Sequence, residues 1–170
     1  MFRSALALLA VATLASGCAS SGAVPKPFPK GPTSARSRPE GPSGTGTVDN
    51  YALTSTALSL RGTPYRSGGD TPAAGFDCSG FTQFVFAQYG IRLPREVKDQ
   101  FEMGKPVKPA DVMAGDLLFF ATTGRHATHV GIAVGGDEFV HAPSSTGVVR
   151  VERLSQTYWS RRYLGARRID

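Results

Sequence analysis

Three side chains in this sequence carry groups that can cooperate in nucleophilic catalysis: one cysteine thiol and two histidine imidazoles. Cys78, in the stretch GFDCSGF, begins a segment whose apolar residues recur at helical spacing. Asp77 is a residue type that caps helices, so Cys78 falls in the first helical turn. Unpaired backbone N–H groups and the positive end of the helix dipole favour a thiolate there, and the same N–H groups can stabilise an oxyanion. The sequence therefore predicts a reactive thiol.

Two of the three histidines lie in a predicted β-hairpin. His129 begins the apolar run 129–134, His141 lies in the run 138–142, and Gly135–Gly136 favour a turn between them. If apolar faces pair with apolar faces, His129 and His141 share one side and lie close to directly opposite each other. That register requires a loop of odd length, such as three residues with a left-handed glycine, whereas a two-residue Gly-Gly loop would put the histidines on opposite faces. We expect the first arrangement, because the second would expose half of the apolar residues.

A histidine pair beside a helix-start cysteine favours a catalytic relay. We expect His129 to act as the general base for Cys78, and His141 to hold the tautomer of the His129 ring. His126 precedes His129 by three residues and is predicted to lie in a loop. The alternatives are a metal site formed by Cys78 and the histidines, and an inert buried thiol. Since no close pair of cysteines is present, we expect no metal and no other cofactor.

The elements that must position these residues follow from hydrophobic periodicity and from glycine and proline signals. Helices are predicted over 48–62, 77–90 and 93–104, and short strands over 116–120, 129–134, 138–142, 147–153 and 162–169. Helices first and strands afterwards indicate an α+β fold, in which an antiparallel sheet of about five to six strands packs on the N-terminal helices.

The N-terminal residues indicate an exported protein. Arg3 precedes an apolar run over 5–15 that is too short to span a bilayer, and small residues precede Cys18. This pattern is similar to a bacterial lipoprotein signal, in which cleavage occurs before the cysteine and the thiol is acylated. It departs from that pattern at Ala15, where leucine is usual. A plain secretory signal and an uncleaved anchor are the alternatives.

We therefore expect three parts: a signal peptide over 1–17, a lipidated Cys18 with a disordered tether over 18–47, and one domain over 48–170. The tether region contains half of the prolines and almost no large apolar side chains, so it cannot bury enough surface to fold. Alanine rather than aspartate follows Cys18, which points to the outer membrane, with the domain facing the periplasm. Several acyl chains on Cys18 would hold the protein there firmly.

Charge is distributed unevenly along the chain. The net charge is +6, yet residues 48–170 carry 14 Lys and Arg against 12 Asp and Glu. The basic tether suits anionic lipid head groups or an anionic wall polymer. We expect no nucleic-acid partner, because the compartment is wrong and no aromatic-plus-basic motif is present. If Cys18 is lipidated, Cys78 is the sole free thiol; a disulfide between the two is the alternative.

Together, the segments DCSGF, HVGI and FVHA resemble the NlpC-type cysteine peptidases, relatives of the papain fold that cleave bacterial wall peptides. Further segments match that family in the same order, namely GTPYRSGG, LPREVKDQ, AGDLLFF and RRYLGARRI. The resemblance covers roughly residues 50–169 and implies a papain-like domain with Cys78 as nucleophile, His129 as base and His141 as its polar partner. The sequence departs from the family pattern at Ala114, where proline is usual.

The resemblance also implies a substrate-binding set. Tyr65 would line the site near the oxyanion, Asp77 and Ser79 would hold the free amino and carboxyl groups of a wall peptide, and Arg95 would contact a carboxylate. Tyr65 as a packed aromatic and Arg95 as a solvated or core-bracing cation are the alternatives. Glu96 stands where serine or threonine is common, and its charge bears on the role of Arg95.

The resemblance implies a lipid-anchored, monomeric peptidoglycan endopeptidase whose partners are stem peptides and the membrane. The short domain on a lipoprotein-like tether is similar to members that cut the D-Ala–diaminopimelate cross-link, so we expect that bond to be hydrolysed. The alternatives are the γ-D-Glu–diaminopimelate bond within one stem, an acyltransferase with the same thioester chemistry, and a wall-binding module without turnover.

Overall fold

The computed structural model describes residues 49–169, so the predicted signal peptide, the lipidation site at Cys18 and the tether lie outside the described residues. The helices of the described part are α1 (Asn50–Ser59), α2 (Cys78–Ala87), α3 (Val97–Phe101), the 3₁₀ turn η1 (Pro109–Asp111) and α4 (Thr157–Ser160). The strands are β1 (Asp70–Thr71), β2 (Gly75–Phe76), β3 (Lys105–Val107), β4 (Leu117–Phe120), β5 (His129–Gly135), β6 (Glu138–His141), β7 (Arg150–Arg153) and β8 (Tyr163–Arg168).

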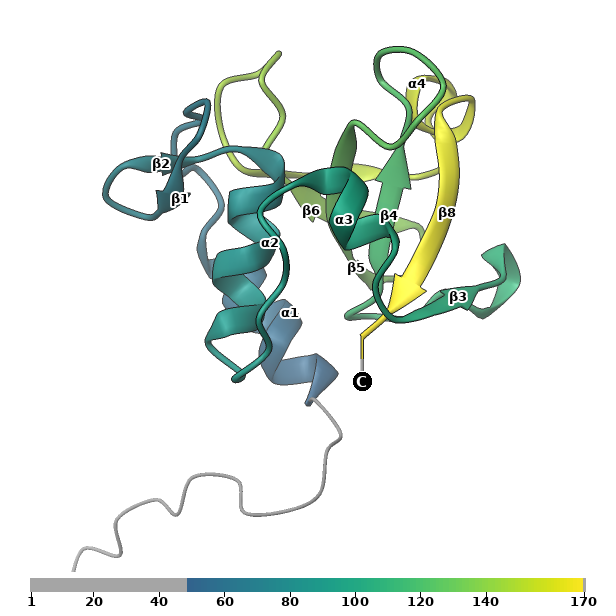
Figure 1. Cartoon of the computed structure of the whole chain (residues 1–170), viewed down its shortest axis with the longest axis horizontal. Coiled ribbons are helices and arrows are strands. Elements are labelled where there is room, and N and C mark those ends of the chain that lie inside the picture. The colour runs from purple at the N-terminus through teal and green to yellow at the C-terminus, as the bar shows by residue number, and fades with distance from the viewer. Residues whose placement is uncertain (1–48, 170) are drawn as a thin grey trace, which may run out of the picture. The chain divides into compact units, whose positions relative to one another are not determined.

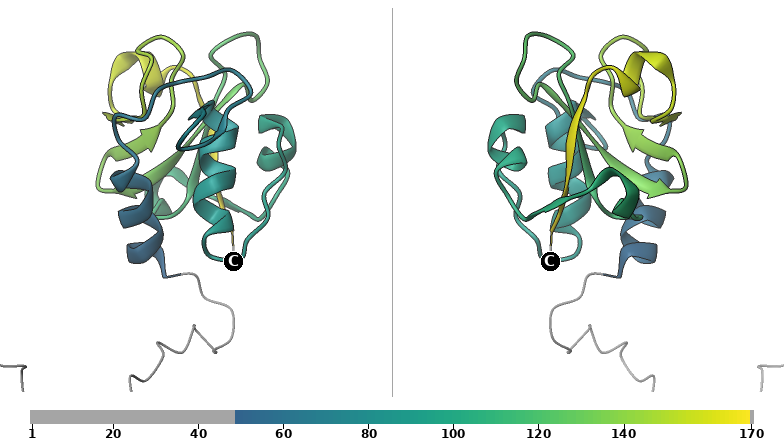
Figure 2. Two further views of the ribbon diagram at one scale, coloured as in Figure 1. Left: turned by 90° about the vertical axis from the view of Figure 1, so that its left-hand side faces the viewer. Right: turned by 90° about the vertical axis from the view of Figure 1, so that its right-hand side faces the viewer.

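Six strands form one sheet in the order β3-β8-β4-β5-β6-β7, and every neighbouring pair is antiparallel. Strands β1 and β2 form a separate small antiparallel pair. Helices α1 and α2 lie side by side on one face of the large sheet and both contact β5 (Figures 1 and 2). This arrangement confirms the predicted α+β fold. Sequence reasoning missed the short strands β1, β2 and β3 and the helix α4.

The central strands are buried on both faces, which separates the core into two clusters. The cluster on the helix side includes Phe81 and Val85 of α2, together with Ile132 of β5. The cluster on the opposite face is built around Phe120 and Trp159 and contains no residue of α1 or α2. The sequence predicted one buried, apolar face for β5, but α4 covers the second face as well, with Trp159, which is 5% exposed. Within residues 49–169, no helix is both long enough and apolar enough to cross a bilayer.

Helix α2 begins and ends where the local residue types require. The Asp77 carboxylate accepts a hydrogen bond from the Gly80 backbone N–H at 2.8 Å, which caps the first turn. Gly90, in the left-handed region with φ 78°, follows the last turn. A Cβ at position 80 would lie 2.1 Å from the Gly69 carbonyl oxygen, so only glycine allows the preceding loop to pack so closely on the start of the helix.

The β5–β6 hairpin pairs Ile132 with Val140, which places His141 opposite Gly131. The two histidines therefore share one face, as predicted, but they are diagonal neighbours rather than directly opposite. The Cβ that a side chain would add at Gly131 lies 3.1 Å from the His141 Cβ, so glycine leaves room for that ring.

The loop of this hairpin differs from the predicted three-residue form. The last strand pair is Gly135 with Glu138, so two residues, Gly136 and Asp137, form the turn. A two-residue loop alone would place His129 and His141 on opposite faces of the sheet. A register shift between Ala133 and Gly135 inserts one extra residue, a β-bulge, and returns them to the same face. The bulge thus keeps both histidines on one side.

Candidate active site

Cys78 lies where the start of α2 meets the start of β5. It is a free thiol, and its side chain is half-buried rather than sealed in the interior. The backbone N–H of Val130 donates a hydrogen bond to the thiol. Because Val130 directly follows His129, this contact brings the sulfur to the end of β5 that carries the first histidine. The first turn of α2 supplies the opposite side of the same site.

His129 and His141 are in direct contact. Nε2 of His129 lies 2.7 Å from Nδ1 of His141, and the two rings are nearly perpendicular, at 82°. His129 is 7% exposed and His141 is fully buried. Since Nε2 of His129 is engaged with His141, its Nδ1 is the ring nitrogen that remains to act on a thiol. The structure therefore brings His129 and His141 together, and the Cys78 thiol reaches the residue that follows His129.

Trp159 of α4 holds both imidazole rings in place. Its indole stacks on His129, with centroids 5.4 Å apart and planes 24° apart, and meets His141 edge-on at 4.9 Å. Phe120 and Phe139 complete the aromatic layer on this face of the sheet. Sequence reasoning did not find this layer. The single tryptophan of the chain, close before the last predicted strand, was the available signal.

Burial controls the charge of all three groups. It raises the pKa of the Cys78 thiol to about 11, although the Val130 and Ser79 backbone N–H groups act in the opposite direction. Burial also lowers the pKa of His129 to about 4. For His141, burial and the charges of His129 and Arg150 together lower the pKa to about 2. The predicted resting thiolate is therefore wrong, because burial outweighs the helix terminus and all three groups are neutral near pH 7.

Asp77, Ser79 and Arg95 form a hydrogen-bonded cluster at the start of α2. The Arg95 guanidinium donates to both carboxylate oxygens of Asp77 and, at 2.7 Å, to the Ser79 hydroxyl. The backbone N–H groups of Gly68 and Gly80 also donate to Asp77, at 2.9 and 2.8 Å. Burial alone would raise the pKa of Asp77, but these hydrogen bonds outweigh it and hold that pKa below its ordinary value. Ser79 is 5% exposed, so its hydroxyl faces its protein partners.

Tyr65 lies at the edge of the same site. Its ring packs on the helix-side core and its backbone pairs with Phe76. Burial raises the pKa of Tyr65, the charges of Cys78 and Asp77 raise it further, and Arg95 opposes them. The phenol therefore lies within electrostatic range of the thiol and of the Asp77–Arg95 pair.

Gln100 connects α3 to the first turn of α2, and sequence reasoning assigned it no role. It is fully buried; its Oε1 accepts from the Thr82 hydroxyl at 2.8 Å, and its Nε2 donates to the carbonyls of Ser79 and Pro94. Since Pro94 precedes Arg95, this amide fixes the segment that carries the guanidinium. The signal that could have revealed this role is that Gln100, an uncharged amide, ends the matched segment LPREVKDQ.

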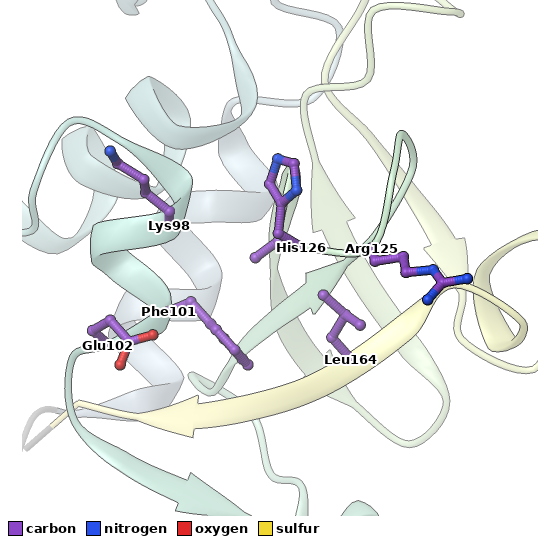
Figure 3. Close-up of a pocket in the computed structure, with 7 residues that line it drawn as sticks. Lys98, Phe101, Glu102, Arg125, His126 and Leu164 are labelled. Carbon is purple, nitrogen blue, oxygen red and sulfur yellow. The ribbon is translucent and has the colours of Figure 1, made fainter.

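His126 lies in the loop before β5, as predicted, and is exposed. It lines a pocket of about 410 Å³ beside the segment that leads into His129. The lining residues come from α3 and its C-cap, from this loop and from β8, as Figure 3 shows, and are Lys98, Phe101, Glu102, Arg125, His126, Ala127 and Leu164. In the described part of the chain, no three His, Cys, Asp or Glu side chains are grouped so that they could hold a metal ion.

The model of the NlpC/P60 family matches residues 62–168. The chain belongs to the NlpC/P60 family. The resemblance found in the sequence is thus confirmed, together with the papain-like α+β fold that it implied.

Proteins similar to this chain include enzymes from two bacteria. The gamma-DL-glutamyl hydrolase of Bacillus subtilis (strain 168) is 43% identical over 120 residues, which cover 69% of this chain and 29% of the relative. The murein DD-endopeptidase MepS/murein LD-carboxypeptidase of Escherichia coli (strain K12) is also 43% identical, over 125 residues that cover 72% of this chain and 61% of the relative. The chain therefore spans less than two thirds of the length of these curated relatives.

Solved NlpC/P60 structures superpose on the same part of the chain. An NlpC/P60 family protein from Bacillus cereus ATCC 10987 has a TM-score of 0.68 at 32% identity, covering 72% of this chain and 41% of that protein. The NlpC/p60 domain of the peptidoglycan hydrolase SagA has a TM-score of 0.63 at 33% identity, covering 72% of this chain and all of that domain.

The two departures from the NlpC/P60 pattern lie away from the histidine pair. Ala114 precedes a turn in which the buried Asp116 is paired with Arg168 at 2.8 Å, so this region supports the fold. Glu96 is exposed and occupies the N-cap position of α3 without a capping hydrogen bond. The Asp77 hydrogen bond is the main cause that raises the pKa of Arg95, and the charge of Glu96 adds to it.

Proposed function

We propose that this protein is a cysteine endopeptidase that hydrolyses the peptides of peptidoglycan. The observation that carries this proposal is the 2.7 Å contact between His129 and His141 beside a half-buried free thiol at a helix start. Such a nucleophile, base and orienting group are the parts that acyl transfer requires. The names of its relatives, among them murein endopeptidases and a peptidoglycan hydrolase, support peptidoglycan as the substrate.

In the proposed mechanism, proton transfer accompanies nucleophilic attack. As Sγ of Cys78 attacks the peptide carbonyl, its proton passes to Nδ1 of His129, and backbone N–H groups at the start of α2 stabilise the oxyanion. The tetrahedral intermediate collapses to a thioester, and the departing amine takes the proton from His129. Water then attacks the thioester, with His129 accepting its proton, and the released thiolate takes that proton back. His141 accepts the Nε2–H of His129 and keeps the ring oriented throughout.

The neighbouring polar cluster is proposed to bind the charged end of the peptide. The Arg95 side chain is 35% exposed and that of Asp77 is 15% exposed, so a cation and an anion both reach the site. A stem carboxylate suits Arg95 and a free amino group suits Asp77, while Tyr65 borders the scissile carbonyl. Ser79 is buried, and we propose that it acts by holding Arg95.

The bond we favour is the D-Ala–diaminopimelate cross-link, with the γ-D-Glu–diaminopimelate bond as the second candidate. Two relatives of equal identity support one bond each by their names, a DD-endopeptidase and a gamma-DL-glutamyl hydrolase. We further propose that residues 1–17 are a lipoprotein signal, that Cys18 is acylated, and that residues 18–47 tether the domain of residues 48–170 to the outer membrane.

The test is digestion of purified, cross-linked wall fragments, followed by mass analysis of the products. We expect cross-linked dimers to become single stems, and a Cys78→Ala protein to leave them intact. Single stems cut while dimers persist would select the γ-D-Glu bond instead. Transfer of a labelled amine to the product would indicate an acyltransferase, and binding without any product would leave only a wall-binding module.

A further inference from the structure

The fully buried His141 has one ring nitrogen without a hydrogen bond. Its Nδ1 contacts His129, whereas its Nε2 has no hydrogen-bond partner among residues 49–169. Oε2 of Glu152 lies 4.0 Å from that Nε2, and the Glu152 side chain is itself only 13% exposed. This separation exceeds hydrogen-bond length, but a carboxylate at this range acts strongly on an N–H dipole where water is excluded. The mechanism described above does not use Glu152.

The fold fixes the Glu152 carboxylate beneath the histidine pair. Strand β7 pairs with β6 so that Phe139 faces Glu152 and His141 faces Arg150, which puts Glu152 diagonal to His141 on the same face. Nε of Arg150 lies 3.1 Å from Oε1 of Glu152, and the Trp159 indole N–H donates to Oε2. The same indole packs against both imidazoles. The carboxylate is therefore held by the group that orients the rings.

We propose that Glu152 is a positioning residue that selects the tautomer of His141 and thereby makes His129 a base. A negative charge near Nε2 of His141 favours the tautomer with hydrogen on Nε2, which leaves Nδ1 as an acceptor. His129 must then donate from its Nε2, so its Nδ1 carries a free lone pair for the thiol proton. The opposite tautomer of His141 would donate from Nδ1, force the hydrogen of His129 onto its Nδ1, and block proton transfer. This inference rests on the proposed peptidase function.

The charge state of His141 supports this assignment. Burial, together with the charges of His129 and Arg150, lowers the pKa of His141 to about 2, so the ring is neutral near pH 7. A neutral imidazole always has one N–H and one acceptor nitrogen, so its tautomer is the property that its surroundings can set. Arg150 keeps the carboxylate in place, and Glu152 remains the anion nearest the free Nε2.

The experiment compares Glu152→Gln with the parent protein by ¹⁵N NMR of the imidazoles, alkylation of Cys78 by iodoacetamide, and kinetics on wall peptides. Glutamine keeps the size of the side chain and an acceptor for Trp159 but removes the charge. We expect the parent to show Nε2–H tautomers at both His129 and His141. We expect Glu152→Gln to show mixed tautomers, with kcat and the alkylation rate each reduced roughly tenfold and KM unchanged. Glu138→Gln, which removes an exposed carboxylate paired with Arg153, is the matched control and should match the parent.

Either of two results would overturn the inference. One is a parent protein whose His141 carries its hydrogen on Nδ1, a result that needs no variant to fold. The other is a folded Glu152→Gln protein with the tautomers and rates of the parent. A parent that alkylates readily and shows the expected tautomers but cuts no wall peptide would refute the proposed function while supporting the role of Glu152. Failure of the role of Glu152 and failure of the proposed peptidase function would therefore give different results.

Discussion

Cys78 lies between two polar groups that are held in place by different kinds of interaction. On the helix side, Asp77 is saturated: it accepts hydrogen bonds from Gly68, Gly80 and both terminal nitrogens of Arg95. On the sheet side, His129 and His141 share a single hydrogen bond, and Nε2 of His141 has no hydrogen-bond partner among residues 49–169, with the Glu152 carboxylate 4.0 Å away. Hydrogen bonds fix the helix side, whereas aromatic packing and a distant charge fix the sheet side.

This difference predicts a division of labour. A saturated ion pair at a helix start stabilises the fold and presents fixed charges to a ligand. Two buried neutral rings do not stabilise the fold through charge, and burial lowers the pKa of both. The presence of two polar rings in the core is therefore better explained by a chemical role than by a contribution to stability. Substitutions on the sheet side should therefore affect turnover far more than stability, and substitutions on the helix side should affect both.

The largest effect is expected from His129→Gln. The amide keeps a polar contact to His141 but cannot accept a proton, so kcat/KM on wall peptides should fall about a thousandfold or more. The melting temperature should fall only modestly near pH 7, because both side chains are neutral there and the main loss is the stacking of the ring on Trp159. His126→Gln, three residues earlier in the exposed loop, is the matched control and should retain at least half of the parent kcat/KM. Comparable losses in both variants would contradict the assignment of His129 as the base.

An intermediate effect is expected from pH, and its sign follows from the lowered histidine pKa. Between about pH 6.5 and pH 4, the His129 ring is protonated in the unfolded chain but stays neutral in the folded chain. Stability is therefore fully present above pH 6.5 and falls with decreasing pH, by about 1.4 kcal/mol per pH unit for each such histidine. Urea unfolding at a series of pH values measures this slope. His129→Gln should reduce the slope, and an unchanged slope would show that the ring is not held neutral.

The sequence predicted those parts of the site that depend on residues close together in the chain, namely the helix start and the strand faces. Asp77 and Cys78 begin a helix because the cap and the apolar periodicity lie within a few residues of each other. His129 and His141 share a face because both strands alternate apolar residues, and the bulge after Ala133 compensates for the shorter turn. The bulge itself was not predictable, since Gly135 and Gly136 favour several turns equally well.

Other features depend on contacts that no local pattern contains. Trp159 covers the second face of β5 because a four-residue helix precedes the last strand, and so short a helix has too few residues for a periodic signal. Glu152 reaches His141 through the β6–β7 pairing, which sequence spacing alone does not specify. The thiol of Cys78 is neutral because tertiary contacts bury the start of the helix. The direction of its pKa shift could therefore not be predicted from the Asp-Cys pair alone.

The smallest effect, and the one that separates the two sides most sharply, is expected from Arg95→Met. The change removes the hydrogen bonds to Asp77 and Ser79 and leaves a partly buried carboxylate without its cation. Because the guanidinium is partly exposed and screened by water, we expect a loss of about 1–2 kcal/mol in unfolding free energy, measured in urea. KM for wall peptides should rise several-fold while kcat changes less, since the histidine pair is untouched. Glu96→Gln, which removes the neighbouring exposed charge, is the control and should leave stability unchanged. A fall in kcat as large as that of His129→Gln would mean that the helix side takes part in proton transfer, and the division between the two sides would be wrong.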